Sequence, residues 1–205
     1  MRKYFTSSDW MTLLQKLGKE KQKILSPQTL QRASGLSREA TLKAVQRLVR
    51  RGSLIKLYKN TYANKFSLPS LEEVAMFYGK PCYISFESAL EDHGILSQAP
   101  QVLTCATTRK LKNLKTPLGE IIFHHLIPRL FNNFDNDRGV LRATAEKSLL
   151  DYLYINLKNN KQVPPLDEFD LGQLDNKKIK KLARIFPQSI GSINLAPKPF
   201  KSYTS

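Results

Sequence analysis

Apolar residues in the first part of the chain recur at the spacing of amphipathic helices. Between Ser8 and Leu17 they fall three and four positions apart, which predicts a first helix. Ser26 followed by Pro27 is a capping residue with proline at the first helical position, so a second helix is expected to begin there. This second helix is short and reaches about Ala33.

A glycine turn joins the second helix to a third. Gly35 can take a positive φ, and Ser37 then caps a segment over residues 38–51 that stops at Gly52. Two helices across a short glycine turn are the helix-turn-helix layout. The third helix should bury one seam of four positions, namely Thr41, Ala44, Val45 and Leu48.

A β-hairpin is predicted directly after the third helix. Residues 54–58 and 61–63 are rich in aliphatic and aromatic side chains, and Lys59-Asn60 between them forms a tight turn with Asn60 in the left-handed region. Three helices followed by a hairpin make a winged helix-turn-helix domain, which we assign to residues 1–67.

The remaining residues, 68–205, predict a second domain of mixed α+β class. Its expected helices and strands alternate irregularly, so the fold class of the whole chain is α+β. The expected helices cover residues 71–79, 85–93, a segment capped by Thr144, and a weak segment at 175–185; the expected strands cover 101–107, 120–126 and 138–142. After about residue 160 the assignment is weak, and the tail Pro197-Lys198-Pro199 is expected to fray.

Positive charge is concentrated in the first domain. The chain has a formal net charge of +16, and residues 1–67 hold fifteen basic against three acidic side chains, or +12 of that total. A third of the chain thus carries three quarters of the excess, which indicates a polyanionic partner for the winged helix. A basic surface that serves solubility alone would not explain this segregation.

From the composition and the N-terminus we expect a cytoplasmic protein without a membrane partner. No stretch is long and apolar enough to cross a bilayer, and Met1-Arg2-Lys3 is not followed by the apolar region of a secretory signal. Cys82 and Cys105 have no metal or redox spacing, so we expect two buried thiols.

The polar face of the third helix supplies the candidate DNA-binding residues. We expect Arg38, Lys43, Gln46 and Arg47 to read base edges in the major groove of double-stranded promoter DNA. Contacts to phosphates or the minor groove are expected from the second helix, the cap of the third helix and the wing: Gln28, Ser37, Arg50, Lys56, Lys59 and Asn60. Because one winged helix covers few base pairs, two copies on an inverted repeat are expected.

An ordered series of short motifs resembles the AbiEi family, the antitoxins of type IV toxin-antitoxin (abortive infection) systems. The match runs over about residues 26–156 and includes 83–90 (YISFESAL), 93–96 (HGIL), 102–109 (VLTCATTR), 115–119 (KTPLG), His124-His125 and 143–151 (ATAEKSLLD), besides the wing. The resemblance implies a bacterial protein whose winged helix represses its own operon. It also implies that the C-terminal antitoxin domain counters a nucleotidyltransferase-like toxin.

The sequence offers no catalytic or metal-binding pattern, so no enzyme, cofactor or metal is expected. His124 and His125 are adjacent, so on a strand they would point to opposite faces and could not share one metal. Polar groups of residues 70–160 are expected not to converge on a catalytic set. Glu146 and Asp151 lie on one expected helix, where Glu146 complements the helix dipole in the first turn. Two alternatives stay open: a nucleic-acid-processing enzyme with a winged-helix targeting domain, and a protein-interaction module.

Overall fold

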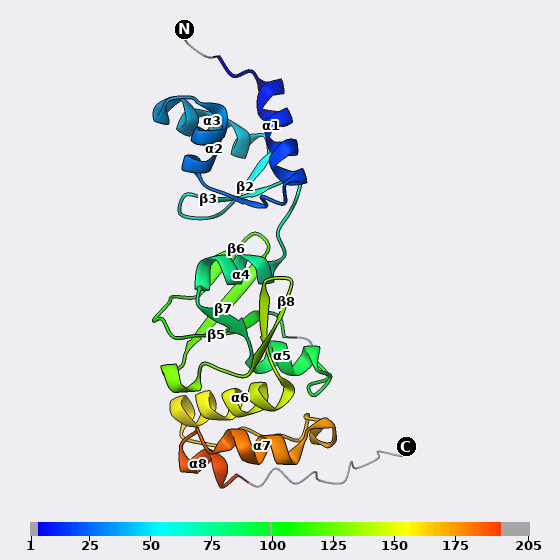
Figure 1. Cartoon of the computed structure of the whole chain (residues 1–205). Helices are drawn as coiled ribbons and strands as arrows, with labels where there is room; N and C mark the ends of the chain where they lie inside the picture. The colour runs from blue at the N-terminus through cyan, green and yellow to red at the C-terminus, as the bar shows by residue number, and fades with distance from the viewer. Residues whose placement is uncertain (1–3, 99, 194–205) are drawn as a thin grey trace. The chain divides into compact units, whose positions relative to one another are not determined.

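The computed structural model describes residues 4–98 and 100–193 (Figure 1). The expected frayed tail at Pro197-Lys198-Pro199 lies outside the described residues. The chain forms two compact units: the first comprises residues 1–74 with 114–120, and the second comprises residues 75–113 with 121–205. The domain boundary expected after residue 67 stays a prediction.

Three helices and a small sheet form residues 7–64 of the first unit; the helices and the hairpin were predicted, and the additional first strand was not. The helices are α1 (Ser7–Lys19), α2 (Pro27–Ser34) and α3 (Arg38–Arg50). The sheet has the strand order β1-β3-β2, all antiparallel, from β1 (Ile24–Leu25), β2 (Leu54–Tyr58) and β3 (Thr61–Asn64). This is the arrangement of a winged helix-turn-helix, with β2 and β3 as the wing.

Local capping explains where the three helices begin. At α1 the Thr6 hydroxyl accepts from the Asp9 amide, and the Asp9 carboxylate accepts in return from the Thr6 amide, which is a capping box. Ser26 caps α2, and Gly35 ends it with φ of 68° in the left-handed region, as predicted. These caps satisfy amide groups that the helices leave unpaired.

One apolar core holds the first unit together. Its buried members come from α1, β1, α2, α3 and β2: Trp10, Leu14, Leu17, Leu25, Leu30, Ala44, Val45, Leu48 and Leu54. Burial of these side chains is the main favourable free energy of this unit, because α2 and α3 are too short to be stable as isolated helices.

The second sheet of the chain is mixed and six-stranded, with the order β6-β7-β5-β4-β9-β8; it belongs to the second unit except for β6 and the first two residues of β7. β4 pairs antiparallel with β5 and parallel with β9, β5 pairs parallel with β7, and β8 pairs antiparallel with β9. The strands are β4 (Cys82–Ile84), β5 (Leu103–Thr107), β6 (Leu114–Thr116), β7 (Gly119–His125), β8 (Phe134–Asp137) and β9 (Val140–Ala143).

Helices cover this sheet and complete its core. They are α4 (Leu71–Gly79), which spans the boundary between the units, α5 (Phe86–Asp92), α6 (Ala145–Asn160), α7 (Asn176–Ala183) and α8 (Gln188–Gly191), with short 3-10 turns at Pro128–Leu130 and Leu171–Gln173. Figure 1 shows α6 between the sheet and the pair α7 and α8. Leu149, Leu150 and Leu153 of α6 are fully buried in the resulting core.

The α+β class predicted from the sequence is confirmed, while several short elements were missed. The two-residue β1 and the strands β4, β6 and β8 did not appear in the sequence prediction, nor did α8. Strands of two to four residues are too short to show an alternating pattern. Among the described residues, no helix has the length and apolar character needed to cross a membrane.

Candidate nucleic-acid interface

The helix α3 presents one buried seam and one exposed polar face. The seam is the one predicted: Thr41, Ala44, Val45 and Leu48 are all buried. The Ser37 hydroxyl caps the helix by accepting from the amide of Ala40 at 3.2 Å. Because the seam fixes how α3 packs into its core, the remaining face must point to solvent.

All ten residues predicted to contact DNA are exposed. They are Gln28 on α2, Ser37, Arg38, Lys43, Gln46, Arg47 and Arg50 in and before α3, and Lys56, Lys59 and Asn60 in the wing. Among residues 4–98 and 100–193, the ion pairs involve none of the cations in this set. Their positive charges are therefore available to an external anion.

The wing is a tight hairpin with a basic tip. Lys59 and Asn60 form its turn, and Asn60 has φ of 48°, in the left-handed region as predicted. A β-bulge lies between Lys56 and Tyr58. The Lys59 Nζ lies 5.8 Å from the centre of the Tyr58 ring, which is a cation–π contact. This contact favours a Lys59 side chain that lies over the neighbouring tyrosine.

Buried and bridging polar contacts fix the end of the wing to the rest of its unit. Asn64, with no exposed surface, donates from Nδ2 to the Leu14 carbonyl at 2.8 Å. Its Oδ1 accepts from the Phe66 amide at 3.1 Å. A second contact is the ion pair between Lys23, directly before β1, and Glu73, with 2.7 Å between Lys23 Nζ and Glu73 Oε1. The hairpin is therefore held to α1 by a hydrogen bond that sequence reasoning did not anticipate.

Three further residues belong to this surface, and the sequence analysis did not single them out. Leu42 is 38% exposed on the polar face of α3, and Tyr58 is 36% exposed in the wing. Arg51, directly after α3, is exposed and donates from Nη1 to the Ser7 hydroxyl at 2.6 Å. An exposed leucine on a basic helix face is a signal that could have been read, since apolar side chains contact the thymine methyl group.

In the second unit, four polar side chains that the sequence analysis did not bring together converge at the centre of the core. Lys147 and Asp151, one helical turn apart on α6, form an ion pair and have no exposed surface. The Tyr83 hydroxyl donates to Asp151 Oδ2 at 2.8 Å, and the Ser85 hydroxyl donates to the same oxygen at 2.9 Å. Lys147 Nζ also donates to the Tyr83 oxygen at 2.8 Å.

Burial controls the protonation behaviour of this cluster, which we call the Lys147–Asp151 network and define by Tyr83, Ser85, Lys147 and Asp151. Desolvation lowers the pKa of Lys147 and raises the pKa of Asp151, while their mutual attraction opposes both shifts. Desolvation likewise raises the pKa of the Tyr83 hydroxyl. These residue types occur in nucleophilic catalysis, but all four lie fully buried in the core, where a substrate does not reach them.

The histidines and cysteines of the second unit have structural surroundings. His93 Nε2 lies 2.8 Å from the Ala143 carbonyl, and His124 packs edge-on against Phe86, where burial lowers its pKa. Cys82 and Cys105 are both buried, as predicted, and burial raises the pKa of Cys82 to about 12. Within the described residues, no group of His, Cys, Asp and Glu side chains could hold a metal ion.

Comparison with solved structures identifies a fold relative. The chain is similar to the crystal structure of the RV2827C protein from Mycobacterium tuberculosis, with a TM-score of 0.58 and 14% sequence identity, over 88% of this chain and 73% of that chain. No protein-family model matches the sequence. No curated protein matches it either. The likeness in structure therefore establishes the fold: an N-terminal winged helix-turn-helix followed by a mixed α+β unit.

Proposed function

We propose that this protein is a DNA-binding autorepressor and antitoxin of a toxin-antitoxin operon that acts in the cytoplasm. Its winged helix binds inverted-repeat promoter DNA, and its second unit counters a nucleotidyltransferase-like toxin. The repressor part is supported by the fold and by the charge of the first unit. The antitoxin part is supported by the resemblance of residues 26–156 to the AbiEi family.

The observation that carries the repressor proposal is the exposed basic face of α3. Arg38, Lys43, Arg47 and Arg50 are all exposed, and the ion pairs among described residues leave their charges free. In a helix-turn-helix the second helix of the motif lies in the major groove, with its N-terminal residues closest to base edges. Arg38 and Lys43 stand at that end of α3 and are our candidates for base recognition, together with Gln46.

Base and backbone contacts are expected to respond differently to mutation. Lys43→Gln should weaken binding to the promoter duplex by about 1–3 kcal/mol and leave binding to an unrelated duplex of equal length nearly unchanged, because a base contact is sequence-specific. Lys59→Gln should weaken binding to both duplexes similarly, because a phosphate carries no sequence information. Fluorescence anisotropy titrations of the purified chain with both duplexes measure this difference.

The matched control is Lys19→Gln, which removes the same charge from an exposed lysine at the last turn of α1. This variant should bind both duplexes like the unmodified chain. Equal affinity of the chain for both duplexes, with no selective loss in Lys43→Gln, would contradict sequence-specific repression. Cleavage of either duplex in the presence of Mg²⁺ would instead favour the alternative of a nucleic-acid-processing enzyme.

Antitoxicity should be separable from DNA binding. A nucleotidyltransferase-like toxin encoded next to this gene is expected, and the full chain should restore growth when both are expressed from unrelated promoters. The double variant Arg38→Ala/Lys43→Ala should rescue growth equally well, because these side chains lie on α3 of the first unit. Loss of rescue in a variant that still accumulates to normal levels would assign neutralisation to the DNA-binding face.

A further inference from the structure

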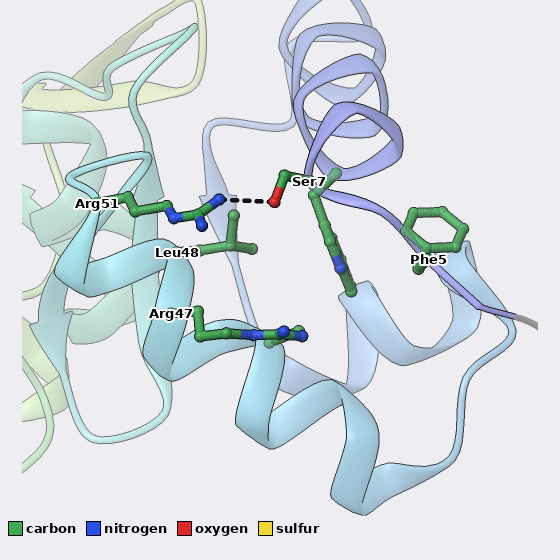
Figure 2. Close-up of a pocket in the computed structure, with 7 residues that line it drawn as sticks. Phe5, Ser7, Arg47, Leu48 and Arg51 are labelled. Carbon is green, nitrogen blue, oxygen red and sulfur yellow. Dashed lines mark hydrogen bonds between the residues drawn. The ribbon is translucent and has the colours of Figure 1, made fainter.

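A small hollow in the first unit lies between the start of α1 and the C-terminal half of α3 (Figure 2). Its volume is about 20 Å³, and its polar lining comes from Ser7, Trp10, Arg47 and Arg51. Phe5 and Leu48 line its apolar sides. Of these residues only Arg47 is among the predicted DNA contacts, so those contacts do not account for the grouping of two arginines, a hydroxyl and an indole.

Trp10 contributes a buried donor that no acceptor satisfies. Its side chain is 3% exposed, and its indole Nε1 has no hydrogen-bond partner among the described residues. The Phe5 ring packs edge-on against it at 4.9 Å between ring centres and covers another side of the indole. A buried donor without an acceptor costs about 1–3 kcal/mol, and Trp10 lines the hollow, so the hollow is a candidate site for an acceptor.

The charges around the hollow favour an anion as that acceptor. Figure 2 shows the side chains of Arg47 and Arg51 on the side of α3, with Arg51 hydrogen-bonded to Ser7 in the first turn of α1. The N-terminus of a helix is the positive end of its dipole. The carboxylate of Asp9 on α1 accepts at 2.7 Å from both the amide and the hydroxyl of Thr6, and these hydrogen bonds lower its pKa, so it stays ionised. The two guanidinium groups at the hollow outweigh this single negative charge.

We propose that one phosphate of the DNA backbone binds at the mouth of this hollow, with one water molecule inside it. The guanidinium groups of Arg47 and Arg51 hold the phosphate oxygens, and the Trp10 indole donates to the phosphate through one water molecule. A volume of about 20 Å³ suits one water, which needs roughly 10–15 Å³. This inference rests on the proposed DNA-binding function, and it moves Arg47 from base recognition to the backbone.

Salt dependence tests the two arginines. The slope of log K against log salt is negative, and its magnitude decreases by about 0.9 for each phosphate contact that is lost. Because both guanidinium groups hold the same phosphate, the double variant Arg47→Gln/Arg51→Gln should flatten the slope by about 0.9, and each single variant by less. All three variants should weaken binding to the promoter duplex and to the unrelated duplex alike. Arg138→Gln, which removes an arginine that is 95% exposed in the second unit, is the matched control and should leave the slope unchanged.

Trp10 provides an independent readout, because it is the chain's single tryptophan. Its fluorescence should change on titration with the promoter duplex and saturate at the same DNA concentration as anisotropy. In Arg51→Gln, saturating DNA should produce a smaller change. Trp10→Phe keeps an aromatic ring in the core but removes the indole donor. It should weaken binding to both duplexes about two- to tenfold, the range expected for one hydrogen bond.

The outcomes separate this inference from the proposed function. If the unmodified chain binds neither duplex, the DNA-binding function fails and the phosphate site fails with it. If it binds DNA while the Arg47→Gln and Arg51→Gln slopes and the Trp10 fluorescence stay unchanged, only the phosphate site is overturned. If Arg47→Gln loses affinity for the promoter duplex alone, Arg47 contacts a base and not the backbone. Thermal melting followed by circular dichroism verifies that each variant is folded.

Discussion

Replacing Asp151 by alanine should lower the free energy of unfolding by about 3–5 kcal/mol, the usual cost of removing one partner of a buried ion pair. The variant leaves the Lys147 ammonium in the core with Tyr83 as its remaining hydrogen-bond partner among the described residues. It also removes the acceptor of the Tyr83 and Ser85 hydroxyl groups. The network joins β4 and the start of α5 to α6, so its loss should loosen the centre of the second unit.

Chemical denaturation followed by circular dichroism measures this effect. Asp137→Ala is the matched control: it deletes a carboxylate that is 80% exposed and lies 3.9 Å from Arg138, and it should change the unfolding free energy by less than about 1 kcal/mol. The double variant Lys147→Met/Asp151→Leu should be more stable than Asp151→Ala, since it leaves no buried charge. A loss below about 1 kcal/mol for Asp151→Ala would contradict the buried ion pair.

The loss of unfolding free energy in Asp151→Ala should become smaller as the pH rises. Burial lowers the pKa of Lys147, and without Asp151 nothing opposes that shift. Between this lowered folded-state pKa and the unfolded value near 10.4, the unfolded chain binds more protons, so stability increases with pH. Denaturation curves at neutral pH and near pH 10, compared with the unmodified chain, should show the two proteins converging.

The first unit was predicted from its sequence because its signals are local. Ser26, Gly35 and Ser37 set the ends of α2 and the start of α3 through contacts within four residues. The seam of α3 follows from helical spacing alone. By contrast, the hydrogen bond from Asn64 to Leu14 joins residues fifty positions apart, and no local pattern indicates it.

The second unit was harder to predict because its order depends on distant pairing. β4 has three residues, all buried between β5 and β9, so it shows neither length nor alternation. β8 is an edge strand with three exposed polar positions and reads as a loop. A lysine four residues before an aspartate normally forms an exposed helical pair. Only the fold places Tyr83, more than sixty residues earlier, against Lys147 and Asp151.

Salt should weaken DNA binding by the first unit steeply. About five phosphates per copy, neutralised by basic side chains of the wing and α3, imply a slope of log K against log salt of about −4 to −5 at 0.9 per phosphate. Raising the salt concentration from about 50 to 200 mM should then reduce the affinity of each copy by roughly 250- to 1000-fold. The physical cause is the release of counterions that the exposed, unneutralised cations displace from the duplex.

Anisotropy titrations with the promoter duplex at four or more salt concentrations measure this slope, and Lys59→Gln should flatten it by about one unit. The +12 charge of residues 1–67 predicts this strong dependence, because few acidic groups offset the basic surface. The +4 charge of the remaining residues predicts that Arg138→Gln and other charge deletions in the second unit leave it unchanged. An affinity that is indifferent to salt would mean that the basic face of α3 and the wing do not meet a phosphate backbone.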